Sequence, residues 1–311
     1  MRAVRRTGWR VALVLLATAA LGAAQTIPQS HPMQRPMPVP GSLNFVEGEV
    51  SLNGQPLTYQ NARYSVVGAG QTLDTHSGNA EILLTPGTFL RVGYNSEIRM
   101  ISPGIADTRV EVTRGEAMLE ATDFVKQAHL TVVVRGANAQ IDQKGLYQFN
   151  ADRQSVTVLD GKAQVFMGDK HSTLRKGEEV QLASDKPLKV RDASLKAAES
   201  EQLYSWSRLR SQYEAQANLE EAYYVNAYGG WYGPGWYWDP YWGMYAFLPG
   251  WGMLYSPFGW GFYAPGFVGI YGGHFVGGVG IGGHPGGIYG PSAAFRGAGG
   301  FHSGFGGGRG R

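Results

Sequence analysis

The stretch Val110–Glu120, VEVTRGEAMLE, returns later in the chain as Val156–Phe166, VTVLDGKAQVF. In each copy, apolar and polar residues alternate up to a turn that ends in Gly115 or Gly161, and the alternation then resumes. Side chains on a strand point to opposite faces in turn, so this alternation is typical of half-buried strands. Each copy therefore predicts an antiparallel hairpin with a glycine in its turn.

One face of each predicted hairpin is apolar. A looser third copy, Phe45–Gly54 (FVEGEVSLNG), turns at Gly48. The apolar faces consist of Val110, Val112, Ala117 and Leu119 in the first copy and of Val156, Val158, Ala163 and Val165 in the second. Repeated units of this kind predict an all-β binding scaffold, although they do not identify a ligand.

The N-terminus has the three parts of a secretory signal peptide. Met1–Arg10 carries four arginines and no acid, Val11–Leu21 is apolar, and small residues at positions 22–24 precede Gln25. The apolar run is shorter than the roughly 20 residues that a transmembrane helix needs, which disfavours a retained membrane anchor. We therefore predict that residues 1–24 are removed and that the protein is exported, to the periplasm or the outer cell surface.

Removal of the signal peptide changes the charge of the chain. Of the 27 Lys and Arg residues, 23 remain against 24 Asp and Glu, which gives a net charge of −1. A protein with this balance lacks the basic surface that nucleic-acid binding requires, so we expect no nucleic-acid partner. The absence of cysteine excludes disulfides and thiolate metal sites.

The mature chain begins with a linker and continues as a β region. Residues 25–40 form a proline-rich segment without apolar periodicity, which predicts an extended linker. Within the β region, residues 41–190, the sequence predicts strands at Ala80–Leu84, Phe89–Tyr94 and Glu97–Ile101, separated by turns at residues 86–87 and 95–96. Closely spaced strands without an intervening helix favour a β sandwich, a roll or a short solenoid.

A series of short motifs runs through this β region in a fixed order. They are Val46–Val50 (VEGEV), Gly68–Thr75 (GAGQTLDT), Ser77–Leu84 (SGNAEILL), Leu90–Ile98 (LRVGYNSEI), Val110–Leu119, Val134–Ala139 (VRGANA), Val156–Val165 and Leu174–Val180 (LRKGEEV). In order and spacing the series resembles the FecR domain, the periplasmic sensor module of iron-dicitrate-type signalling systems. The resemblance covers nearly half of the chain and implies a β domain that contacts another envelope component, without assigning any contact residue.

The chain departs from the FecR-type sigma-factor regulators in one respect. Those regulators resemble a three-part design, in which a cytoplasmic helical segment and one membrane span precede the sensor domain. Here only the predicted signal peptide and linker precede the β region. We therefore expect a FecR-like domain without the segment that holds a sigma factor, and we do not infer a role in transmembrane signalling from the resemblance.

A helix is predicted after the β region, over residues 192–224. This segment lacks Gly and Pro, and Asp192 is a suitable N-cap. Its apolar stripe, at the three-to-four spacing of an amphipathic helix, consists of Leu195, Ala198, Leu203, Trp206, Leu209 and Tyr213. The stripe predicts packing on the β domain, with helix-mediated dimerisation as the alternative.

An aromatic and glycine-rich region follows, over residues 226–271. Three octads begin with proline: PGWGMLYS from Pro249, PFGWGFYA from Pro257 and PGFVGIYG from Pro265. Each octad predicts a turn followed by a short strand that cannot bury its own apolar face and must pack on a neighbour. Beyond it, residues 272–311 are rich in glycine, which predicts disorder.

Aromatic side chains of this region are the candidate contact residues. Trp and Tyr offer large, stiff contact area with a polar edge, which suits protein, sugar and membrane surfaces. The candidates are Trp231, Trp236, Trp238, Trp242, Trp251, Trp260, Tyr255, Tyr263 and Tyr271. Two interpretations remain open: the rings pack on the β domain as a lid, or they contact an external glycan, membrane or second copy.

Catalytic chemistry has no support in the sequence. The seven histidines show no pair at metal-ligand spacing, and no acid–base pair, phosphate loop or nucleophile elbow is present. We predict no enzyme, no cofactor and no metal site. The leading hypothesis is an exported, non-catalytic envelope protein that binds an envelope protein, cell-wall or outer-membrane component. The alternatives are an adhesive protein that self-associates through its C-terminal tail, and a module that binds cell-wall glycan.

Overall fold

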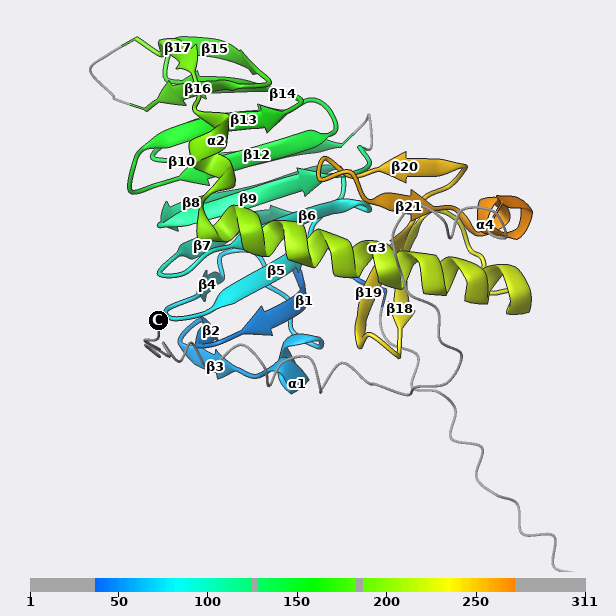
Figure 1. Ribbon diagram of the computed structural model, residues 1–311. Helices are drawn as coiled ribbons and strands as arrows, with labels where there is room; N and C mark the ends of the chain where they lie inside the picture. Colours follow the sequence, from blue (N-terminus) through cyan, green and yellow to red (C-terminus); the bar gives the residue numbers. More distant parts are fainter. Residues whose placement is uncertain (1–36, 125–127, 183–186, 272–311) are drawn as a thin grey trace, which may run out of the picture. The chain divides into compact units, whose positions relative to one another are not determined.

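Figure 1 shows a computed structural model of the protein, which describes residues 37–124, 128–182 and 187–271. The predicted signal peptide, most of the linker and the glycine-rich tail lie outside the described residues, so those predictions stay untested. In the described ranges strands predominate, and one long helix follows them. The all-β fold class is therefore confirmed.

Two sheets form the layers of a sandwich. The first sheet, in spatial order, contains β1 (Ser42–Glu47), β5 (Asn79–Leu83), β6 (Thr88–Val92), β9 (Glu116–Ala121), β12 (Gly145–Asn150), β13 (Ser155–Asp160), β16 (Glu178–Gln181) and β17 (Val190–Asp192). The second contains β15 (Lys170–Arg175), β14 (Lys162–Met167), β11 (Ala137–Ile141), β10 (His129–Val134), β8 (Asp107–Arg114), β7 (Glu97–Pro103), β4 (Thr72–Asp74), β2 (Val50–Leu52) and β3 (Gln55–Leu57). A short helix, α1 (Tyr59–Ala62), follows β3. The predicted strands at 80–84, 89–94 and 97–101 correspond to β5, β6 and β7.

The repeated stretches are not hairpins, so the predicted pairing is wrong. In the first copy β8 lies in the second sheet and β9 in the first, and in the second copy β13 and β14 are likewise divided between the sheets. The chain crosses from one sheet to the other at Gly115 and Gly161, as it does near Gly48 between β1 and β2. A single residue between strands is too short for the two-residue turn of a tight hairpin, and strands that switch sheets make the corners of a sandwich.

The predicted apolar faces of these stretches are nevertheless confirmed. All eight side chains are at most 1% exposed and belong to the core between the two sheets. A strand that changes sheets at a corner keeps presenting alternate residues to the space between the layers, so the pattern is the same as in a hairpin. Each glycine at a crossing has a positive φ, 68° at Gly115 and 92° at Gly161, and a Cβ at Gly161 would collide with the hydroxyl of Tyr147.

The predicted single helix is two helices. Asp192 is not an N-cap but the last residue of β17, where it pairs with Glu178. The first helix, α2 (Leu195–Glu199), is capped by Ser194, whose Oγ accepts the N–H of Ala197, and the second, α3 (Gln202–Tyr228), extends beyond the predicted end. As Figure 1 shows, α3 lies across the first sheet on the face that points away from the sandwich core.

The aromatic region forms two small sheets and a helix. They are built from β18 (Gly235–Asp239) with β19 (Met244–Leu248), from β20 (Met253–Tyr255) with β21 (Gly261–Tyr263), and from α4 (Pro265–Tyr271). The first two octads form the predicted turn and strand. The third does not, because Pro265 opens a helix, a position where its missing N–H costs no hydrogen bond.

Candidate contact surface

The outer face of the first sheet carries charged side chains that are completely buried. Glu81 on β5 is the cross-strand neighbour of Arg91 on β6, and Glu120 on β9 lies diagonally across from Arg91. Arg91 Nε lies 2.8 Å from Glu81 Oε2, and Arg91 Nη1 lies 2.5 Å from Glu120 Oε2. None of the three side chains is exposed to solvent. Helix α3 covers this ion cluster.

The predicted apolar stripe packs on the outer face of the first sheet through Leu195, Ala198, Leu203 and Trp206, and α3 adds a polar face over the ion cluster. Leu203 is buried as expected, but Leu209 is 45% exposed. The side chains that α3 buries near the cluster are Ser207, Arg210, Ser211, Glu214 and Asn218. Arg210 Nη2 lies 2.7 Å from Glu81 Oε1, and the Ser211 hydroxyl donates to Glu120 Oε1 at 2.7 Å. Charge pairing with the sheet and the apolar contacts of the stripe together fix the rotation of the helix.

The pKa values of Glu81 and Glu214 are shifted in opposite directions. Burial tends to raise the pKa of Glu81, but the charges of Arg210 and Arg91 outweigh it and lower this pKa to about 2. For Glu214, burial and the negative charge of Glu81 raise the pKa well above its ordinary value. Asn44 Nδ2 donates to Glu214 Oε1 at 2.7 Å. These effects favour the protonated form of Glu214, which adds no third negative charge to the cluster.

The aromatic region packs on the same outer face, beside the ion cluster. Phe89 on β6 meets Trp236 on β18, with ring centroids 5.2 Å apart in an edge-to-face arrangement. Phe89, Trp236, Phe247 and Phe262 all belong to one buried cluster. The rings of Trp236, Phe247 and Phe262 therefore pack on the β domain, which is one of the two interpretations of the aromatic region.

Asn218 joins α3 to both small sheets. Its Nδ2 donates to the carbonyl oxygen of Phe247 on β19 at 2.8 Å and to that of Tyr263 on β21 at 3.0 Å. Its Oδ1 accepts the Tyr263 N–H at 2.7 Å. Because the side chain is fully buried, these hydrogen bonds fix the two sheets against the helix.

The candidate contact residues divide by exposure. Trp251 is 89% exposed, Tyr255 64% and Trp231 42%, whereas Trp236 is buried. Trp238, Trp242, Trp260 and Tyr263 are half-buried, and the side chain of Tyr271 lies outside the described residues. Along β18, the neighbouring rings of Trp236 and Tyr237 are both buried, so both faces of this strand are covered there.

Several exposed tyrosines were missed by the sequence analysis. Tyr224 and Tyr228 are 58% and 79% exposed and lie one turn apart near the end of α3, with ring centroids 5.1 Å apart. Tyr232 is 56% exposed and stacks on Tyr237 at 4.2 Å. Their spacing of four residues, 224, 228 and 232, was the signal available in the sequence. We name the exposed rings Tyr223, Tyr224, Tyr228, Trp231, Tyr232, Trp251 and Tyr255 the aromatic surface.

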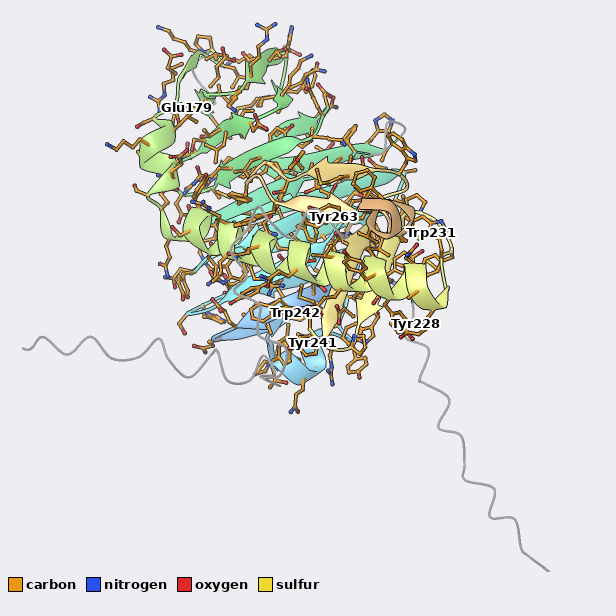
Figure 2. All side chains as sticks on the ribbon, turned by 45° about the vertical axis from the view of Figure 1, so that its right-hand side comes forward. Glu179, Tyr228, Trp231, Tyr241, Trp242 and Tyr263 are labelled. Atoms are coloured by element: carbon orange, nitrogen blue, oxygen red, sulfur yellow. The ribbon has the colours of Figure 1, made fainter. Side chains whose placement is uncertain are left out.

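The aromatic surface gathers around the C-terminal end of α3. Figure 2 shows Tyr228 and Trp231 at that end, while Tyr241 and Trp242 lie at the hairpin tip near α1. Residues 249–252 reach the same end of the helix, because Gly250 lies against Pro234. Between residues 211 and 271 the sequence has no Lys or Arg and four acids. The segment that supplies the aromatic surface therefore contributes no cation of its own.

Within the described ranges, no group of three or more His, Cys, Asp or Glu side chains is placed to hold a metal ion. None of the helices described is long and apolar enough to cross a membrane. The self-association hypothesis rests partly on residues 272–311 and stays a prediction.

No family model and no curated protein matches the chain. Among solved structures, two crystal structures of a "putative anti-sigma factor" from Parabacteroides distasonis ATCC 8503 are similar to it, at 17% and 16% sequence identity and a TM-score of 0.35 in both cases. Each comparison covers 40% of this chain and 60% of the other, so the chain spans less than two thirds of the length of these proteins. A likeness of this strength carries no functional argument, and the FecR resemblance stays a prediction.

Proposed function

We propose that this protein is an exported, non-catalytic binding protein of the cell envelope, in which a FecR-like β sandwich carries a contact surface for another envelope component. The observation that carries the proposal is the division of the aromatic region. One set of rings is buried against the sandwich, and another set, up to 89% exposed at Trp251, points outward.

The buried rings explain why the exposed ones are suited to binding. Exposed tryptophans and tyrosines on an unfolded segment lose conformational entropy when they bind a partner. Here Asn218, the ion cluster and the Phe89–Trp236 contact already hold their backbone in place. Large aromatic side chains on a fixed backbone are the residues that most often dominate protein interfaces.

The test is site-specific photo-crosslinking of the full-length protein in living cells. A photoreactive residue replaces Tyr228 or Trp251 on the aromatic surface, and in the control it replaces Ile105, which is 54% exposed on the sandwich. We expect both aromatic positions, and not Ile105, to crosslink to the same envelope component. Crosslinks from Ile105 alone would indicate that the contact lies on the sandwich and not on the aromatic surface. Retention of the protein in the cytoplasm would overturn the proposal.

A cell-wall glycan is the second candidate partner, favoured by the exposure of Trp251. A tryptophan with most of its surface in solvent offers a flat apolar face on which a sugar ring can stack. Soluble cell-wall fragments should then quench tryptophan fluorescence saturably, and Trp251→Ala should remove most of the effect. Unchanged quenching in that variant would exclude Trp251 as the stacking residue.

A further inference from the structure

The rings of the aromatic surface carry no cation above them among the described residues. Elsewhere the chain does place guanidinium groups over rings: Arg210 Cζ lies 4.2 Å from the ring centroid of Phe45, and Arg91 Cζ lies 5.3 Å from that of Phe89. Those four side chains are buried. The solvent-facing sides of the exposed rings are therefore available to a cation from another part of the chain or from a partner.

An exposed acid lies beside these rings. Of the four acids between residues 211 and 271, three are buried, and the exposed one is Glu220. Glu220 lies one helical turn before Tyr223 and Tyr224, so it shares a face of α3 with both rings. The surroundings of the aromatic surface thus favour a cationic ligand over an anionic one.

The segment that follows α4 carries cations of the type that stack on rings. Residues 272–311 contain Arg296, Arg309 and Arg311, and no Asp, Glu or Lys. Each of these arginines has glycine beside it, so no neighbouring side chain obstructs the approach of its guanidinium to a flat ring. Arginine stacks on aromatic faces better than lysine does, because the guanidinium is planar and more weakly hydrated.

This segment begins beside the aromatic surface. Val268 on α4 packs against Ala222 and Val225 of α3, within the same turn of the helix as Tyr223 and Tyr224. Figure 1 shows α4 next to the C-terminal half of α3. The end of α4 therefore delivers the chain to the rings.

The length of the segment is sufficient for its arginines to reach the rings. Arg296 comes 25 positions after Tyr271, the last residue of α4. A glycine-rich chain of this length has an r.m.s. end-to-end distance of about 25–30 Å, whereas Val225 and Tyr228 are only about 5 Å apart along the helix axis. Such a tether gives an effective concentration on the order of millimolar. Contacts that are too weak to form between separate molecules are therefore populated within one chain.

We propose that the arginines of residues 272–311 stack on the exposed rings of the aromatic surface of the same chain, and that this segment covers the surface until an external partner displaces it. The contact itself requires no external partner. Its role as a cover rests on the proposed function, since it concerns the same surface.

Photo-crosslinking of the purified, full-length mature protein tests the contact. A photoreactive residue replaces Phe301, which lies between Arg296 and Arg309 in the sequence, and mass spectrometry identifies the crosslinked peptides. We expect the crosslinks to concentrate at residues 223–232 and 249–255. The reference is the sandwich around Ile105, which is 54% exposed and should crosslink rarely.

A mixture of isotopically light and heavy protein identifies the chain that supplies the segment. Crosslinks within one copy are expected. Crosslinks between light and heavy copies alone would assign the contact to the segment of a second copy and would contradict the inference.

A triple variant decides whether the arginines are responsible. Arg296→Gln, Arg309→Gln and Arg311→Gln together should lower the yield of crosslinks to the aromatic surface by about two- to fivefold or more, the effect of losing at least one exposed contact between a cation and a ring. Arg175→Gln, at an exposed position on β15, should leave the yield unchanged. The inference is overturned if the triple variant crosslinks like the wild type, or if the crosslinks spread evenly over the sandwich.

The role as a cover is tested in living cells with the photoreactive residue at Tyr228. In the triple variant, crosslinks from this position to the envelope component should increase by about two- to fivefold, because the competing segment is weakened. An unchanged yield would contradict the cover. The purified protein contains no envelope component, so a negative result there counts against the contact within the chain, whereas a lack of envelope crosslinks from both the wild type and the variant in cells counts against the proposed function.

Discussion

Arg210 and Glu81 lie 129 positions apart in the chain and meet at 2.7 Å, with Glu81 completely buried. This ion pair attaches α3 to the outer face of the first sheet. Since α3 in turn holds both small sheets through Asn218, the position of the aromatic surface depends on a contact between two charged side chains.

Replacing Arg210 by methionine should destabilise the protein strongly. The substitution keeps an unbranched apolar stem, removes the guanidinium and leaves Glu81 with only one of its two guanidinium partners. Loss of one member of a buried ion pair typically costs about 3–5 kcal/mol. Urea unfolding measures this cost, and Arg208→Met, at an exposed position on the same helix, should change the free energy of unfolding by less than about 0.5 kcal/mol. Equal effects of the two variants would contradict the role of the pair.

Glu81→Gln and Glu214→Gln should have different effects at pH 7. Glu81 is held ionised by two guanidinium groups, with a pKa of about 2, so its stabilising contribution is present above about pH 4.5 and is lost as pH falls toward 2. Glutamine at this position should cost about 3–5 kcal/mol. The raised pKa of Glu214 favours its protonated form, which glutamine resembles, so this substitution should change stability by about 1 kcal/mol or less and should remove the destabilising contribution of ionised Glu214 at alkaline pH. Urea unfolding between pH 5 and pH 9 distinguishes the two.

Alanine at the sheet-crossing glycines should cost more than alanine at an open turn. Gly115 and Gly136 have positive φ values of 68° and 79°, so both substitutions carry a backbone cost of about 1–2 kcal/mol. At Gly115 the new Cβ also lies 2.7 Å from the Asn95 carbonyl oxygen, whereas at Gly136 nothing lies within 4 Å. We expect the unfolding free energies of the two variants to differ by about 1–3 kcal/mol. This difference measures the cost of placing a Cβ in the crowded crossing at Gly115. No difference would mean that the corner relaxes freely.

Two tryptophans of the aromatic region should behave differently on truncation. Trp236→Ala empties a position that is 4% exposed and packed on Phe89, which should cost about 3–5 kcal/mol. Trp251→Ala removes a ring that is 89% exposed and should leave stability within about 0.5 kcal/mol of wild type. Thermal unfolding of both variants checks this, and a large loss for Trp251→Ala would show that this ring is part of the packing.

The sequence predicted the strands and the inward faces but not the pairing of the repeated stretches. In the sequence, a glycine between two alternating runs looks the same whether it lies in a hairpin turn or at a crossing between two sheets. At Gly115 the difference lies in contacts with Asn95 and Ser96, some twenty residues away. Local alternation does not encode which distant strand provides the hydrogen bonds.

The polar contacts of α3 were not predicted for a related reason. Its apolar stripe packs on the sheet as predicted, except at Leu209, which is exposed. The sequence pattern did not show that the same face of the sheet presents Glu81 and Glu120, toward which the helix turns Arg210 and Ser211. For the same reason the division of the aromatic region into buried and exposed rings was not predictable, since it depends on Phe89 and Leu83 of that same face.

The ion cluster also has a consequence for the order in which the chain is made. Ribosomes release the sandwich, residues 41–192, before α3 and the aromatic region exist, so the outer face of the first sheet is uncovered during synthesis. An entirely apolar face would then be open to aggregation. Glu81, Arg91 and Glu120 lie in its middle, so we expect their charges to bind water while the face is uncovered and to exchange that water for Arg210 when α3 packs on the sheet.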